Sequence, residues 1–200
     1  MKRILIASAL VAGTALAAGD LGAQVSKNSG FLLNLHRAGS YLGWSLENGE
    51  TQRGIGGGFG LGVGYGIGES FALVLNLDAG SVSSDVDEDT HVLAHFDIGG
   101  RLNFGTTASP LRPYVNAALS GVAEGTSGEP GEEDVIMSGA GLTLGGGLQY
   151  FVSPHFALDA ALQGSFGTFT QIQEGDVTDE LDEAAKFTTA RLQLGVSWHP

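Results

Sequence analysis

Apolar side chains recur at every second position along most of the chain, a period that is typical of β-strands. The clearest example is the stretch GIGGGFGLGVGYGIGES, residues 54–70. Glycine fills most of one set of alternate positions there, and Ile, Phe, Leu, Val and Tyr fill the other. Because successive side chains of a strand point to opposite faces, this segment predicts a strand with one apolar face and one nearly bare face.

The same alternation predicts seven further strands. The earliest is less regular, since its alternation weakens after His36. An even number of antiparallel strands is what a closed membrane barrel requires. The apolar positions of these segments fall within residues 31–35, 71–79, 92–104, 115–119, 140–150, 156–162 and 190–198.

Short and long connections take turns between the predicted strands. The short ones are residues 68–70, 105–112 and 152–155, and the long ones lie near residues 47–53, 83–90, 124–134 and 170–186. Membrane barrels have short turns on the periplasmic side and longer loops outside. With a periplasmic N-terminus, every long connection falls outside, and residues 179–186 of the last one are expected to form a short helical turn.

Charged residues indicate which face of each strand meets lipid. Of the 22 acidic residues, 17 lie in the four long connections, and only Asp78, Asp97 and Asp159 lie in strands. These three, with Arg101 and Arg191, occupy the positions opposite the apolar set. A soluble barrel would carry many Lys and Glu on its outer face. The apolar positions are therefore predicted to face lipid, and glycines to leave room for bulky side chains in a narrow lumen.

Aromatic residues support a membrane setting because they gather beside the short turns or the C-terminus. Rings at one level are typical of the girdle at a membrane interface. The predicted fold class is all-β, an eight-stranded antiparallel up-and-down transmembrane β-barrel. The girdle residues are Tyr65, Phe71, Phe104, Tyr150, Phe156 and Trp198.

The N-terminal residues have the features of a secretory signal peptide. Lys2 and Arg3 precede an apolar run over residues 4–18, and residues 15–17 read Ala-Leu-Ala, a small-x-small cleavage pattern. The run is shorter than the roughly 20 residues that a membrane-spanning helix needs. We expect residues 1–23 to be a signal peptide, cut after residue 17 or 23, and residues 24–200 to form the barrel domain, exported to the cell outer membrane.

Four segments carry a family resemblance: GGGFGLGVGYG, LRPYVNAALSG, GGGLQYFVSPHFALDAAL and the closing TTARLQLGVSWHP. With them the chain resembles the small eight-stranded outer-membrane β-barrel family that includes outer-membrane proteins A, X and W of Gram-negative bacteria. The resemblance implies that the last strand, with its terminal aromatic, is recognised by the barrel-assembly machinery during insertion. This chain departs from the family pattern by placing His199 and Pro200 after Trp198.

Composition excludes several kinds of chemistry. The chain has no cysteine, so disulfides, zinc–cysteine sites and thiol catalysis are absent. With 3 Lys and a formal net charge of −13 it is a poor nucleic-acid partner. It contains no G-x-S-x-G elbow and no Gly-Lys-Ser/Thr phosphate loop. We therefore expect no catalytic residues, cofactor or metal site.

Two patterns invite a metal interpretation. His91 and His95 would form a metal pair on a helix, but four residues of strand span roughly 13 Å, so lumen hydrogen bonding is expected instead. The acidic segment DVDED, residues 85–89, begins like a calcium loop. Thr90 stands where that loop needs glycine and Phe96 where it needs glutamate. A solvated acidic loop is expected, with weak divalent-ion bridging to lipid headgroups as a hypothesis.

The five strand charges predict a structural ion-pair network that plugs the lumen; a selectivity filter in a narrow pore is the alternative. The leading function is a non-catalytic outer-membrane barrel with a structural or surface-interaction role. A narrow channel for small solutes, a lipid-modifying enzyme and a soluble ligand-binding barrel remain alternatives. Outer-membrane lipids are expected partners, and the external partner is not specified by the sequence. The network comprises Asp78, Asp97, Arg101, Asp159 and Arg191.

Overall fold

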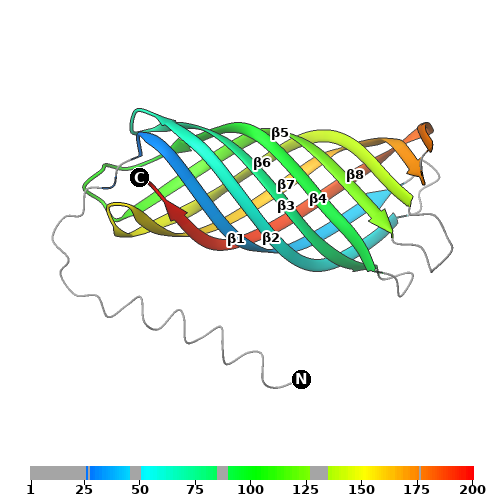
Figure 1. The fold of residues 1–200 in the computed structure, drawn as a ribbon, viewed down its shortest axis with the longest axis horizontal. Coiled ribbons are helices and arrows are strands. Elements are labelled where there is room, and N and C mark those ends of the chain that lie inside the picture. The colour runs from blue at the N-terminus through cyan, green and yellow to red at the C-terminus, as the bar shows by residue number, and fades with distance from the viewer. Residues whose placement is uncertain (1–25, 27, 46–50, 85–89, 127–134, 176) are drawn as a thin grey trace, which may run out of the picture.

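The structure, a computed structural model, describes residues 26, 28–45, 51–84, 90–126, 135–175 and 177–200. Its eight strands pair in chain order, each antiparallel to the next, and β1 closes onto β8 (Figure 1). The predicted fold class is thus confirmed. The strands are β1 (Gly30–Ser45), β2 (Thr51–Ile67), β3 (Phe71–Ser84), β4 (Thr90–Asn103), β5 (Leu111–Thr126), β6 (Val135–Ser153), β7 (Phe156–Glu174) and β8 (Val177–Trp198).

Among the described residues, no helix is long and apolar enough to cross a bilayer. The predicted signal peptide, residues 1–23, and the acidic segment, residues 85–89, lie outside the described residues. Both assignments therefore stay predictions.

The two ends of the barrel differ in their connections. The C-terminus and the connections β2–β3, β4–β5 and β6–β7 gather at the left-hand end in Figure 1, which we call the turn end. The strand ends that adjoin the other four connections, β1–β2, β3–β4, β5–β6 and β7–β8, lie at the opposite end, which we call the loop end. This is the alternation that the connection lengths predict.

The strands are staggered, which fixes their inclination. Following paired residues once around the barrel from Leu33 leads back to β1 at Gly43, ten residues further on. A stagger of this size in an eight-stranded barrel corresponds to strands tilted by about 35–45° from the axis. Each residue along a strand therefore advances about 2.5 Å along the barrel axis.

Side-chain direction follows the sequence prediction. Leu73, Ile98 and Leu194 point outward and are 53%, 52% and 59% exposed, whereas Asp97 and Arg191 are 1% and 0% exposed inside. Within β1 the inward and outward positions alternate regularly up to Ala38. The apolar face is thus the outer face of the barrel, as a lipid-facing surface requires.

The glycines of β2 make room for polar side chains across the lumen. A Cβ atom built on Gly60 would lie 2.1 Å from His36 Nε2 and 2.5 Å from Asp78 Oδ1. One built on Gly62 would lie 2.5 Å from Asn76 Oδ1. A larger residue at either position would displace these polar groups, as predicted for the bare face of this strand.

Aromatic side chains surround the turn end on the outer face. Tyr65 and Phe156 are 50% and 51% exposed, and Trp198 is paired in register with Phe156. Phe31 joins them, since its ring packs edge-on against Tyr65 with centroids 5.3 Å apart. The girdle predicted from the sequence therefore lies at one end of the barrel.

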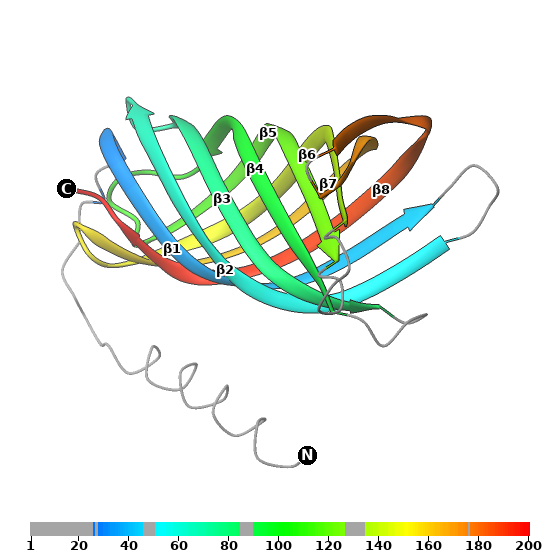
Figure 2. The same ribbon diagram turned by 45° about the vertical axis from the view of Figure 1, so that its right-hand side comes forward.

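The fourth long connection is shorter than predicted. Residues 170–174 continue β7 and residues 177–186 continue β8, so the expected helical turn at residues 179–186 is wrong. The two strands pair up to Glu174 and Val177, and Gly175 in the turn has a φ of 54°. This hairpin, coloured orange to red, reaches beyond the barrel wall in Figure 2. Polar residues occur on both faces of the hairpin, beside Ile172, Val177 and Leu181, so regular apolar alternation is lost there although the strands persist.

Candidate functional site

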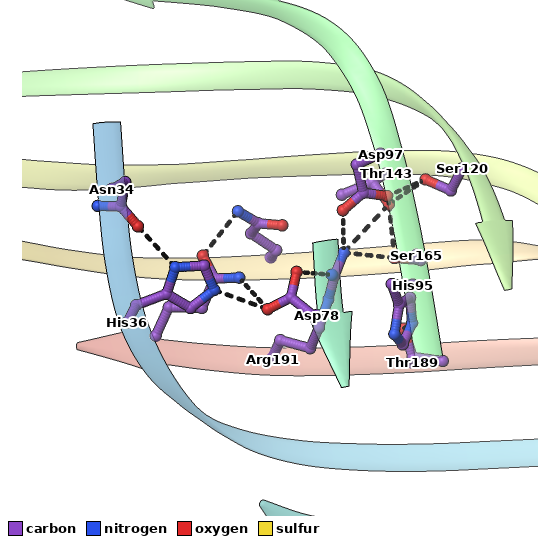
Figure 3. Close-up of polar contacts among 12 residues, drawn as sticks. Asn34, His36, Asp78, His95, Asp97, Ser120, Thr143, Ser165, Thr189 and Arg191 are labelled. Carbon is purple, nitrogen blue, oxygen red and sulfur yellow. Dashed lines mark hydrogen bonds and ion pairs between the residues drawn. The ribbon is translucent and has the colours of Figure 1, made fainter. Parts of the chain in front are cut away.

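The centre of the lumen is built around one guanidinium, that of Arg191 on β8. Its Nη1 donates to Asp78 Oδ2 at 2.8 Å, and its Nη2 donates to Asp97 Oδ2 at 2.7 Å (Figure 3). The arginine side chain is wholly buried. One cation thus joins two carboxylates from neighbouring strands β3 and β4.

Hydroxyl groups from three more strands complete this layer. Ser120 on β5 and Thr143 on β6 donate to Asp97 Oδ1 at 2.5 and 3.1 Å. Thr143 and Ser165 on β7 lie 2.6 Å apart, and Arg191 Nη2 lies 3.3 Å from Ser165 Oγ. The contacts therefore run continuously through strands β3 to β8, as Figure 3 shows.

The remaining side of the layer is supplied by β1. His36 Nε2 lies 2.7 Å from Asp78 Oδ1, and its Nδ1 lies 2.6 Å from Asn34 Oδ1. Gln193 Nε2 also donates to Asp78 Oδ1, at 3.1 Å. With Gly60 of β2 leaving space, we call this set of side chains from seven strands the Arg191 layer.

The two histidines of β4 have separate lumen partners. His95 Nε2 lies 3.1 Å from Thr189 Oγ1, and His91 contacts Glu124. Both rings point into the lumen, as expected. The described residues hold no group of three His, Cys, Asp or Glu side chains that could bind a metal ion.

Arg101 and Asp159 lie in a second cluster toward the turn end, so the predicted network is two clusters. Arg101 Nη1 is 3.9 Å from Asp159 Oδ2, and its guanidinium stacks 4.0 Å from the Tyr114 ring centroid. Asp159 accepts hydrogen bonds from Tyr114, Gln149 and Ser197 at 2.7, 3.0 and 3.1 Å. The carboxylate depends more on these neutral donors than on the arginine.

Arg112, which the sequence pattern does not single out, fills the lumen at the turn end. Its side chain is fully buried; Nη1 donates to Ser26 Oγ at 3.1 Å, Nη2 to the Glu69 carbonyl at 3.0 Å and Nε to the Phe104 carbonyl at 3.2 Å. The available signal was its position, two residues before Tyr114 on the lumen face of β5. Burial in this mouth lowers the pKa of His199 to about 4, and the Arg101 guanidinium contributes to the shift.

The loop end of the lumen is apolar, unlike the charged and hydroxyl-rich centre. The rings of Phe169 and Phe187 pack with centroids 4.8 Å apart. Leu93 and Val122 occupy inward positions of the same strands that carry Asp97 and Ser120 lower down, so the inner face changes character along each strand. The loop-end cluster comprises Leu42, Val82, Leu93, Val122, Phe169, Ala185 and Phe187.

A closed barrel with an apolar outer face, an aromatic girdle and a packed interior with a polar centre defines a transmembrane β-barrel of the outer-membrane type. Residues 4–199 match the family described as "Outer membrane protein beta-barrel domain". The chain belongs to this family and is a protein of the outer membrane. The turn end is accordingly periplasmic and the loop end extracellular.

Solved structures share the fold at low sequence identity. Neisserial surface protein A is 20% identical, with a TM-score of 0.63, over 85% of this chain and 97% of that one. OprG of Pseudomonas aeruginosa is 11% identical with a TM-score of 0.55, covering 88% and 98%. AlkL, solved in lipid bilayers, is 12% identical with a TM-score of 0.52, covering 86% and 90%. Comparison with curated protein sequences gave no match.

Proposed function

We propose that this chain is a closed, non-catalytic outer-membrane barrel with a structural or surface-interaction role. The observation that carries the proposal is the Arg191 layer, in which side chains from seven strands meet across the lumen. Each terminal nitrogen of Arg191 bonds a carboxylate. A passing solute would not displace this side chain readily, because separating a buried ion pair leaves charges without partners.

The loop-end cluster adds a second barrier above the Arg191 layer. Leu93, Val122 and Phe169 are 3%, 2% and 0% exposed, so a hydrated ion entering from outside would meet apolar side chains first. Ions lose favourable hydration in an apolar constriction. Both barriers favour a closed barrel over the narrow channel.

Planar-bilayer recording tests the choice between a closed barrel and a channel. Purified protein inserted into a neutral bilayer in concentrated KCl is expected to give no discrete conductance steps. Insertion is verified separately, by protection of the strands from added protease. Reproducible steps whose number grows with inserted protein would contradict a closed lumen.

Among the described residues, His95 lies beside the Thr189 hydroxyl, as a general base would lie beside a nucleophile. Both side chains are buried beneath the loop-end cluster, at 3% and 1% exposure, so no lipid ester can reach them in this arrangement. Incubation of the folded barrel with radiolabelled phospholipid is expected to leave the lipid unchanged. A product that also disappears in His95→Ala protein would establish a lipid-modifying enzyme instead.

A surface role would fall to the extracellular end, where the β7–β8 hairpin is acidic and exposed. Thr178, Asp179 and Glu180 are exposed there. Cell fractionation followed by protease treatment of intact cells is expected to cut the extracellular connections while the strands stay in the membrane fraction. Protection of the hairpin on intact cells, with cutting only after lysis, would contradict this orientation.

A further inference from the structure

The basic side chains of the described chain divide evenly between the two faces of the barrel. Those inside belong to the contacts described above. Those outside stand on strands β8, β1 and β2 only. The inner set is Arg101, Arg112 and Arg191, and the outer set is Arg37, Arg53 and Lys186.

Arg53 and Lys186 flank the same short segment of β1. Arg53 on β2 is paired with Gly43, and Lys186 on β8 is paired with Ser45. Thr188 on β8 is also paired with Gly43. Arg53 and Thr188 thus stand on either side of Gly43, which has no side chain, and Lys186 stands two residues from Thr188 on β8.

A pocket of about 320 Å³ lies at this place on the outer face, lined by Tyr41, Gly43, Arg53, Lys186 and Thr188 among its residues. The Tyr41 hydroxyl reaches over Gly43, to 3.0 Å from where a Cβ atom on that glycine would lie. Any side chain at position 43 would therefore crowd the pocket. Two cations and two hydroxyl groups surround the space that glycine leaves open.

Neither cation of this pocket is neutralised by the described part of the chain. Arg53 and Lys186 are both exposed, and no salt bridge joins either to another described residue. In a chain with a net charge of −13, two neighbouring cations that no described carboxylate neutralises are unusual. Their charge is available to an anionic ligand.

The position of the pocket along the barrel axis shows which part of the membrane surrounds it. Tyr41 lies ten residues beyond Phe31 of the girdle on the same strand, which at this tilt is about 25 Å along the axis. The apolar band of an outer-membrane barrel is about 25 Å tall. Tyr41 and Thr188 therefore stand at the extracellular edge of the band, and Arg53 and Lys186 stand just above it, level with the outer-leaflet headgroups.

We propose that this pocket binds the phosphate headgroup of an anionic outer-leaflet lipid. An arginine fork and a lysine ammonium both match phosphate oxygens, and hydroxyl groups add neutral donors. Below the pocket, Tyr41 is flanked by Ile55 on β2 and Ala190 on β8, which offer an apolar wall to acyl chains. A phosphate that is joined to a lipid tail contacts both the polar pocket and the apolar wall, whereas a free phosphate contacts only the polar pocket.

Native mass spectrometry of the folded, full-length barrel tests this site with two lipids of identical acyl chains. Phosphatidic acid is expected to bind at least about tenfold more tightly than phosphatidylcholine, since only the former has an anionic phosphate monoester. The double variant Arg53→Gln, Lys186→Gln should lose this preference. Each single variant should lose part of it. Equal affinity of the wild type for the two lipids would overturn the proposal.

A matched control keeps the net charge and moves the cations. This control adds Thr90→Arg and Ser138→Lys to the double variant and so places cations on the outer face of β4 and β6, near the loop end. Loss of the preference in this variant supports a specific pocket, whereas its retention would show general surface attraction. Displacement of phosphatidic acid by millimolar inorganic phosphate would overturn the lipid assignment. These outcomes do not depend on whether the lumen conducts.

Discussion

At the scale of single residues, the charged side chains of the lumen differ in how much each contributes to the stability of the barrel. Arg191 bonds two carboxylates directly, whereas Arg101 lies 3.9 Å from its carboxylate and rests on the Tyr114 ring. Asp159 keeps three neutral donors without Arg101. The sequence places both arginines in the lumen, but their different importance comes from the neighbours that folding brings to each.

Substitution should reveal this difference. Arg191→Leu leaves Asp78 and Asp97 facing each other without a cation, and loss of one partner of a buried pair costs about 3–5 kcal/mol. Arg101→Leu should also lower stability, but by about 1–2 kcal/mol, the scale of one weakened cation–π and ion-pair contact. Urea unfolding in lipid vesicles measures both. Equal losses would contradict the two-cluster arrangement.

Arg37 is a residue whose position the apolar alternation does not predict. It points outward and lies six residues beyond Phe31, about 15 Å along an apolar band of about 25 Å, near the middle of the membrane. Its guanidinium sits 5.2 Å from the Phe59 ring centroid. Contact with that ring offsets only part of the cost of placing a cation in lipid.

Arg37→Leu should therefore stabilise the barrel in neutral phosphatidylcholine vesicles by about 1–3 kcal/mol, since a midplane arginine costs about 2–4 kcal/mol and the ring contact returns some of it. Phe59→Leu is the companion variant and should destabilise the barrel, because it removes the partner ring and leaves the charge. A destabilised Arg37→Leu barrel would mean that the guanidinium has a stronger partner in the membrane.

At the scale of strands, the sequence predicts the membrane-embedded parts and misses the extension. A half-buried strand alternates because lipid and lumen impose opposite demands on successive side chains. Beyond the membrane both faces of β7 and β8 meet water, so polar residues satisfy each face and the period disappears. The register shift between Phe169 and Gln171 marks this change in β7.

The hairpin should accordingly be dispensable for the barrel. Deletion of residues 172–179, with Gln171 joined to Glu180 through Asn-Gly, removes paired strand but no part of the Arg191 layer or the loop-end cluster. Asn-Gly favours the type I′ turn that joins the strands of a two-residue hairpin. Gel mobility of the folded form and the unfolding midpoint in urea should stay close to wild type. Failure to fold would show that the extension guides strand pairing.

At the scale of the whole molecule, three layers fill the lumen: a polar cluster at the periplasmic mouth, the Arg191 layer and the loop-end cluster. The sequence supplies the inward residues through their alternation, yet it does not say which of them touch. Arg191 and Asp78 are 113 residues apart, and their contact depends on the ten-residue stagger around the barrel. Stagger follows from closure of all eight strands and has no local signature.

The periplasmic mouth should make stability depend on pH. His199 is nearly buried, its pKa is lowered from 6.5 to about 4, and Arg101, Arg112, Asp159 and His155 surround it. Between these two pKa values the unfolded chain binds a proton that the folded chain does not. Stability therefore rises with pH through this window and falls on acidification.

A His199→Phe variant isolates this contribution, because the new ring can pack on Phe151, whose centroid lies 5.1 Å from the imidazole. The free energy of unfolding of wild type minus that of the variant should fall by about 1–3 kcal/mol between pH 7 and pH 4. Urea titrations at several pH values measure it. A difference that stays constant with pH would show that His199 titrates alike in both states.

The position of Arg191 in the last strand bears on the order in which the barrel is assembled. Asp78 and Asp97 belong to the first half of the chain, while Arg191 belongs to the strand synthesised last and seals the seam against β1. An incomplete sheet that lacks this strand holds two neighbouring carboxylates without the arginine that bonds both of them. Pairing of β8 with β1 therefore closes the barrel and neutralises the buried carboxylates in the same step. Folding intermediates that lack β8 gain little stability by entering the bilayer.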